Sequence, residues 1–102
     1  MNSRPRPVSA SRLLQELPNV GPRTAGDLLR LGIREPSELK GLDPFRMYDR
    51  LCRRDGVRHD PCLIDVFISI TEFAKGRPAR PWWDFTARRK AAMKKRGGAA
   101  KR

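Results

Sequence analysis

Prolines and glycines punctuate this chain at short intervals, and they limit what it can fold into. Four prolines stand where a helix is expected to start, because a helix needs no amide hydrogen at its first position: Pro22, Pro36, Pro44 and Pro61. Three glycines stand where a helix is expected to end, because glycine easily adopts the left-handed backbone of a C-cap: Gly32, Gly56 and Gly76. No stretch between them alternates polar and apolar residues over the length of a strand. We therefore predict an all-α fold of short helices.

Apolar residues between these marks predict a compact bundle of five helices. The first is marked by Leu13, Leu14 and Leu17, with Ser9 or Ser11 as its cap. The next three begin at the first three prolines named above. The fifth, after Asp60 and Pro61, is apolar over most of its surface, which is more than a single-sided surface helix needs. We interpret it as the central helix of the bundle, or as a helix covered by a partner protein or a second copy of the chain.

An internal repeat constrains the arrangement further. Residues 15–29, QELPNVGPRTAGDLL, and residues 37–51, SELKGLDPFRMYDRL, align without gaps at an offset of 22. Five positions are identical: Glu16/Glu38, Leu17/Leu39, Pro22/Pro44, Asp27/Asp49 and Leu29/Leu51. Both copies have the layout helix, tight turn, proline, helix. We expect the two units to pack against each other and bury both leucine stripes.

Charge indicates the kind of partner. The chain has 102 residues, which is room for one domain, and carries 23 Lys and Arg against 11 Asp and Glu, a net charge of +12. Such an excess favours a polyanion, nucleic acid before anionic membrane. Residues 87–102 hold eight of the cations and no acid, as is typical of a disordered arm. We expect a flexible segment 1–8, a folded domain 9–86 and a basic tail 87–102 that is disordered in the protein alone.

The stretch LPNVGPRTA, residues 17–25, is a tight turn that ends at the start of a helix. The first amides of a helix have no acceptor within it, and the helix dipole adds partial positive charge there. Glycine at position 21 would let a phosphate oxygen approach the backbone without meeting a Cβ atom. The turn is therefore a candidate anion site, although a plain connector between two helices would have the same outline.

LPNVGPRTAGDLLRLGI, residues 17–33, resembles the helix-hairpin-helix motif of DNA repair and recombination proteins, with Asn19 in place of the first glycine. Asparagine tolerates left-handed backbone better than most residues. From about residue 13 to residue 85, through stretches such as HDPCLIDVFISITEFA and PWWDF, the chain resembles the small bacterial "pathogenicity locus" helix-hairpin-helix family, whose members are sometimes labelled mitomycin-resistance proteins. The resemblance implies a tandem helix-hairpin-helix repeat of sterile-alpha-motif-like type, and non-sequence-specific DNA binding in repair, recombination or protection.

In helix-hairpin-helix proteins, amides of the turn and the next helix hold a DNA phosphate, a contact that positions a protein without reading sequence. The resemblance implies this role for Asn19, Val20, Gly21, Arg23 and Thr24. Some relatives also bind a monovalent cation on turn carbonyls, which here would belong to Gln15, Leu17 and Val20. We expect the tail to add affinity through six cations: Arg88, Arg89, Lys90, Lys94, Lys95 and Arg96.

The second copy of the repeat departs from the motif. Gly41 keeps the first glycine, but Asp43 stands where Gly21 stands in the first copy. A carboxylate there would cap the next helix and repel phosphate. We therefore predict one hairpin that faces DNA and one that is structural.

Two other residue groups leave alternatives open. Trp82, Trp83 and Phe85 are predicted to fold back as an apolar plug, although tryptophans can also stack on unpaired bases. Cys52, His59 and Cys62 give three potential zinc ligands at an unfamiliar spacing, whereas a closed zinc site needs four. Buried free thiols are the favoured interpretation, so we expect neither a metal nor a cofactor.

The sequence lacks the signatures of common enzymes and of secreted or membrane proteins. It has no P-loop, no nucleophile elbow and no cluster of acids for a two-metal nuclease, so we expect no enzymatic activity. It has neither an apolar run long enough to span a bilayer nor a signal peptide, so we expect a cytoplasmic protein. The alternatives to DNA binding are a protein-binding adaptor, which would use the apolar fifth helix, and RNA binding through the tail.

Overall fold

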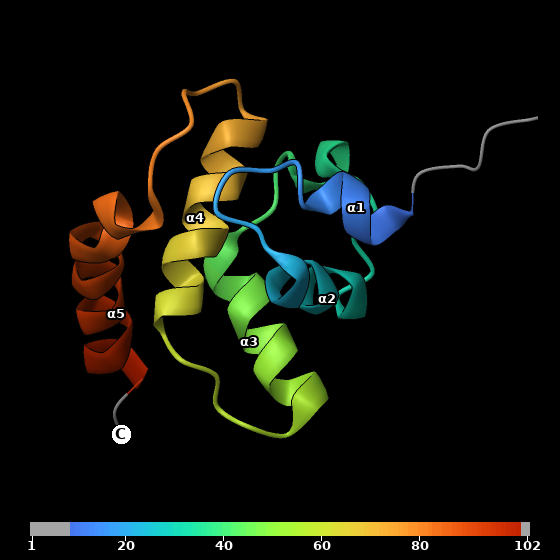
Figure 1. Cartoon of the computed structure of the whole chain (residues 1–102). Coiled ribbons are helices and arrows are strands. Elements are labelled where there is room, and N and C mark those ends of the chain that lie inside the picture. The colour runs from blue at the N-terminus through green and yellow to red at the C-terminus, as the bar shows by residue number, and fades with distance from the viewer. Residues whose placement is uncertain (1–8, 101–102) are drawn as a thin grey trace, which may run out of the picture.

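This computed structural model describes residues 9–100, with side chains through residue 96, and in this range helices are joined by turns and loops. Five α-helices and two short 3-10 helices follow in the order α1 (Ala10–Leu14), α2 (Pro22–Arg30), η1 (Pro36–Leu39), α3 (Pro44–Asp55), α4 (Cys62–Ala74), η2 (Trp82–Phe85) and α5 (Thr86–Ala100) (Figure 1). Within this range there is no strand, which confirms the predicted all-α fold. The segment 1–8, expected to be flexible, lies outside the described residues.

The predicted helix boundaries are set by local capping. The Ser9 hydroxyl accepts a hydrogen bond from the Arg12 amide at 3.2 Å and so caps α1. The Asp43 carboxylate caps α3, accepting from the amides of Phe45 at 2.8 Å and Arg46 at 3.4 Å. Gly56 ends α3 in the left-handed conformation, with φ of 69°. These helices therefore begin and end at the capping residues that the sequence predicted.

Helix α4 is the centre of the bundle. It packs against α3, η1, η2 and α5, and Figure 1 shows it between α3 and α5. Ile64, Phe67, Ile68 and Ile70 have no exposed surface. This burial explains why α4 is apolar nearly all round, and it confirms the central position predicted for this helix.

The two repeated turns have the same backbone geometry. Asn19 has φ of 67° and Gly41, 22 residues later, has φ of 84°. In each turn the next residue donates its amide to a leucine carbonyl, Val20 to Leu17 at 3.4 Å and Leu42 to Leu39 at 3.1 Å. An extended N-cap and a proline at the first helical position then follow in both. The repeat in the sequence is thus a repeat of turn structure, although η1 before the second turn is a 3-10 helix and α1 before the first is an α-helix.

The prediction of a disordered basic tail was wrong for the described part of this segment, which is helical. Helix α5 runs from Thr86 through the glycine pair at 97–98 to Ala100. It packs against α4 and η2. Carboxylates of α4 pair with its arginines, and Met93 packs against the hydrophobic core. A run of like charge can therefore fold here because the central helix supplies opposite charges.

The apolar plug is a second correction. Phe85 is buried, but Trp83 is 62% exposed and Trp82 is half-buried. Trp82 and Trp83 contact each other edge to face, with ring centroids 5.6 Å apart. Only one of the three aromatic residues therefore plugs the core, and the tryptophan pair lies on the surface.

Candidate nucleic-acid interface

The turn between α1 and α2 is held to the rest of the protein on one side and exposed to solvent on the other. The Asn19 side-chain amide donates to the Ser69 hydroxyl of α4 at 3.1 Å and to the Arg80 carbonyl at 2.8 Å. Val20 is buried in the core, whereas Gly21 and Arg23 are exposed. The left-handed Asn19 therefore keeps the predicted turn, and its side chain also ties that turn to the segment before η2.

Helix α2 begins without a capping side chain. Its N-cap is Gly21, and no side chain accepts hydrogen bonds from the first amides, which include those of Arg23 and Thr24. Gly21 is extended, with φ of −100° and ψ of −171°, and a Cβ atom there would meet nothing within 4 Å. The fold therefore does not require glycine at this position, and the missing side chain leaves the helix start open.

The start of α3 is the matched contrast. The residue equivalent to Gly21 is Asp43. Its carboxylate accepts hydrogen bonds from the amides of Phe45 and Arg46 in the first turn of α3, the positions equivalent to Arg23 and Thr24. A carboxylate in that place occupies the anion position and carries the charge that repels another anion. Of the two equivalent turns, only the first has amides available to an external anion.

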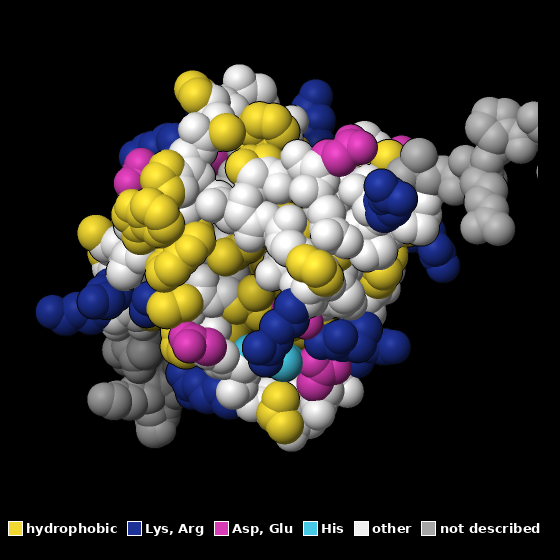
Figure 2. Space-filling model, viewed as in Figure 1, with side chains coloured by type: hydrophobic (Ala, Val, Ile, Leu, Met, Phe, Trp, Pro, Cys, Tyr) yellow, Lys and Arg dark blue, Asp and Glu magenta, His cyan; other side chains and the backbone are white. Residues whose placement is uncertain are grey.

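A groove of ≈ 580 Å³ adjoins the open helix start. Its wall on the α2 side includes Pro22, Arg23 and Thr24, and its other side is formed by Leu63 and Val66 of α4 and by Trp82. Figure 2 shows the corresponding hollow in the middle of this face, with hydrophobic side chains gathered beside it and Lys or Arg side chains at its edge. The lining also includes polar side chains, among them Asp27 and Asp60. The groove therefore combines an apolar wall, an aromatic ring, charged side chains of both signs and an open helix start.

Ion pairs involve several of the residues that line this groove. Arg30 lines it and contacts Asp27 at 2.6 Å and Asp55 at 2.9 Å, and His59 Nε2 lies 2.7 Å from the Asp55 carboxylate. The hydrogen bond from Arg30, and then the one from His59, lower the pKa of Asp55. Arg30 is thus neutralised internally, and the exposed Arg23 is the cation nearest the turn in sequence.

The six basic residues predicted for the tail divide into two groups. Arg88 pairs with Glu72 at 3.1 Å, Arg89 with Asp65 at 2.8 Å and Arg96 with Asp49 at 2.6 Å. The side chain of Arg89 is only 11% exposed. Lys90, Lys94 and Lys95 are exposed, and none of them forms an ion pair within the described part of the chain. Helix α5 therefore uses its arginines to dock on the bundle and leaves its lysines to solvent.

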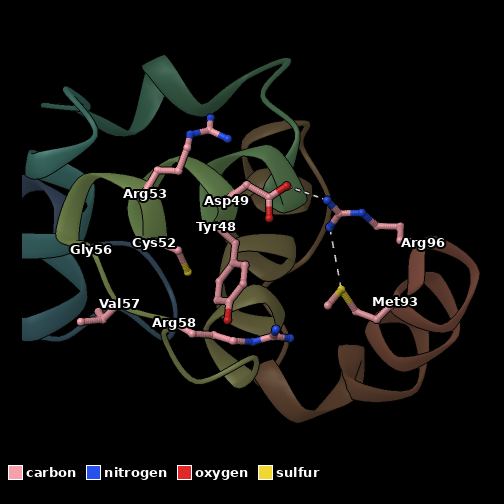
Figure 3. A pocket seen from close by; sticks show the side chains of 9 residues that line it. All are labelled: Tyr48, Asp49, Cys52, Arg53, Gly56, Val57, Arg58, Met93 and Arg96. Atoms are coloured by element: carbon pink, nitrogen blue, oxygen red, sulfur yellow. Dashed lines mark hydrogen bonds and ion pairs between the residues drawn. The ribbon is translucent and has the colours of Figure 1, made fainter. Parts of the chain in front are cut away.

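A second cavity, of ≈ 560 Å³, lies between α3 and α5 (Figure 3). Tyr48 and Cys52 line it from α3, while Met93 and Arg96 line it from α5. The Tyr48 hydroxyl donates to the carbonyl of His59, and the Arg96 guanidinium stacks over Phe45 at 5.3 Å. Arg96 therefore joins α5 to α3 across the edge of this cavity.

The cysteines are half-buried free thiols. Cys52 Sγ accepts from the His59 amide at 3.4 Å, and Cys62 Sγ lies 3.9 Å from Arg89. Burial, and then a hydrogen bond with Asp60, raise the pKa of Cys62. Among the residues the structure describes, no three His, Cys, Asp or Glu side chains converge as metal ligands.

The carbonyls proposed for a monovalent cation are partly in use. The Leu17 carbonyl accepts from the Val20 amide. Cation binding by Gln15, Leu17 and Val20 stays a prediction.

Acid should weaken the fold through Glu72. Burial opposes its ionised form, but hydrogen bonds from Arg88 and Arg77 outweigh burial and lower the pKa of Glu72. A carboxyl with a lowered pKa contributes stability above its unfolded pKa of about 4, and loses it as pH falls through the folded pKa. We expect the midpoint of thermal unfolding, followed by circular dichroism, to fall between about pH 5 and pH 3. A Glu72→Gln variant should have a lower thermal midpoint at pH 7, and its midpoint should fall less between pH 5 and pH 3 than that of the wild-type protein. If the midpoints of both proteins fall equally, Glu72 is not the source of the acid sensitivity.

These features define a small all-helical protein with an uncapped helix start, an adjoining groove and a lysine-bearing helix on its surface. The chain belongs to the Pathogenicity locus family, whose model matches residues 8–91. This confirms the predicted resemblance to that family, whereas the resemblance to a helix-hairpin-helix motif stays a prediction. It is 42% identical over 80 residues to a protein of Streptomyces lavendulae named "Mitomycin resistance protein McrB", and the match covers 78% of this chain and 76% of that protein. No solved structure matches the chain.

Membrane insertion through a helix finds no support in the described residues. None of the helices within residues 9–100 has both the length and the apolar character needed to cross a bilayer.

Proposed function

We propose that this protein binds DNA without sequence preference, holding a backbone phosphate at the start of α2. The observation that carries the proposal is the contrast between the two equivalent turns: Asp43 caps α3, whereas Gly21 leaves the first amides of α2 uncapped. Open amides at the positive end of a helix dipole form a phosphate site. In this proposal the two turns form a tandem helix-hairpin-helix, with the first facing DNA and the second structural.

Charge supports a polyanionic partner. The chain has a net charge of +12, the exposed Arg23 follows the turn, and exposed lysines remain on α5. Each phosphate neutralised by a cation releases counterions and adds about 0.9 to the slope of log affinity against log salt. We therefore assign the phosphate contact to Asn19, Gly21, Arg23 and Thr24, and additional affinity to Lys90, Lys94 and Lys95. Repair, recombination or protection of DNA is the setting that the motif suggests.

The adaptor alternative has less apolar surface of α4 to use than the sequence suggested. Most of the large apolar side chains of α4 are buried within the chain itself, Leu63 and Val66 are half-buried, and Phe73 is 39% exposed. RNA remains the alternative polyanion. Competition between DNA and RNA of equal length and sequence distinguishes the two.

Gly21→Asp is the variant that tests the phosphate site. We expect it to lower affinity for a 20-base-pair duplex by at least tenfold, because its carboxylate would take the phosphate position and repel the ligand by about 1–4 kcal/mol at 4 Å. The fold should not suffer, since a side chain at position 21 meets no neighbour and aspartate caps a helix at least as well as glycine. Affinity is measured by fluorescence anisotropy at several salt concentrations, and stability by urea unfolding.

Gly21→Asn is the matched control. Asparagine caps as well as aspartate and has the same shape without the charge, so this variant should retain clearly more affinity than Gly21→Asp. Unchanged binding by Gly21→Asp, with the protein folded, would remove the turn from the DNA site.

A further inference from the structure

The tryptophan pair is placed beside the open start of α2. Trp82 lines the same groove as Arg23 and Thr24. Trp83, its neighbour, is 62% exposed, although a tryptophan is among the largest apolar surfaces that a chain can bury. Trp83 does not line the groove itself but contacts Trp82, with ring centroids 5.6 Å apart.

Several contacts hold the pair in position. The Arg80 carbonyl accepts from the Asn19 side chain of the turn at 2.8 Å. The Arg80 side chain contacts Asp84 at 3.2 Å and lies over the ring of the buried Phe85 at 4.9 Å. The segment that carries the tryptophans is thus fixed to the turn on one side and to the core on the other. Trp83 is therefore an exposed residue within a regular element, the 3-10 helix η2.

We infer that the tryptophan pair binds unpaired bases of DNA, one stacked on Trp82 in the groove and a neighbouring base on Trp83. This inference rests on the proposed function and adds the class of DNA that is bound. The ligand would be DNA in which a single-stranded segment adjoins the phosphate held at the turn. Aromatic side chains beside a positively charged path are the usual means of holding single strands without reading sequence.

The angle between the rings favours unpaired bases over duplex. The two ring planes are 82° apart, whereas neighbouring bases in a duplex are parallel and already stacked. A single strand can turn between two successive bases, so each base can lie flat on its own ring. The groove walls from Leu63 and Val66 are apolar and suit the face of a base, while Arg23 on the opposite wall suits its phosphate.

The test compares a 20-base-pair duplex with the same duplex carrying a six-nucleotide single-stranded tail. We expect the wild-type protein to bind the tailed DNA about tenfold more tightly, because stacking of each base contributes on that scale. Trp83→Ala should remove most of this preference while leaving affinity for the plain duplex unchanged, and Trp82→Phe should keep more of it than Trp82→Leu. Tryptophan fluorescence should be quenched by the tailed DNA. Phe73→Ala, which removes an exposed aromatic ring outside the groove, is the control and should change nothing.

The outcomes separate the two proposals. Equal affinity for both DNAs, or a preference that survives Trp83→Ala, overturns the inference; if duplex binding still depends on position 21, the proposed function stands. If the wild-type protein binds neither DNA, both proposals fail. Tighter binding of an RNA tail than of a DNA tail of the same sequence overturns the assignment of the strand to DNA.

Discussion

Replacing Asp65 with alanine should lower the free energy of unfolding by about 3–5 kcal/mol, because it leaves a largely buried guanidinium without its counter-charge. Asp65 has no exposed surface. Its carboxylate accepts from Arg89 Nε at 2.8 Å and from the Thr86 hydroxyl at 2.7 Å. A loss of this size is a large share of the roughly 5–15 kcal/mol by which a domain of this length is stable. Urea unfolding followed by circular dichroism measures it.

Two further variants separate the charge from the packing. Arg88→Ala removes an arginine that is 56% exposed in its pair with Glu72, and should cost no more than about 1 kcal/mol. The double variant Asp65→Leu, Arg89→Met replaces the buried pair by apolar side chains of similar size, and should recover most of the loss. If the double variant is as unstable as Asp65→Ala, the destabilisation does not come from an unpaired charge. Removing α5 altogether is a poor probe of DNA binding for the same reason, since it strips Asp65 and Glu72 of these partners.

Phe67→Ala should cost about 3–5 kcal/mol, since it removes a ring with no exposed surface from the middle of α4 and leaves a cavity. Elements pack against α4 from several parts of the chain, α3, η1, η2 and α5, so we do not expect movement of one element to fill the cavity. The same unfolding measurement applies, with the slope against urea checked to confirm that unfolding remains two-state.

Phe73→Ala on the same helix is the matched control. Phe73 is 39% exposed, so its truncation should change stability by no more than about 0.5 kcal/mol. A comparable loss at both positions would mean that α4 is covered on its outer side as well, as a partner protein or a second copy of the chain would cover it.

The sequence by itself determined the elements whose physics is local. Serine and aspartate caps, prolines at first helical positions and the left-handed glycine of α3 depend on neighbours within a few residues, and they set most helix boundaries correctly. The 22-residue repeat determined that the two turns share one backbone path, including a left-handed asparagine at position 19. The unusual apolarity of residues 62–74 identified the central helix, because only a helix covered on several sides needs apolar residues nearly all round.

Only the tertiary structure decided the state of the basic segment and of the tryptophans. A run of cations repels itself when considered alone, and it folds as α5 because two carboxylates of α4 supply opposite charges: Glu72, 16 residues before Arg88, and Asp65, 24 residues before Arg89. A signal was present, since these two acids stand seven residues apart on one face of an otherwise uncharged helix, but the spacing does not identify their partners. The tryptophans likewise read as core by composition. Whether such a ring is buried depends on whether the core has room for it, and here Phe85 takes the buried place and leaves Trp83 at the surface.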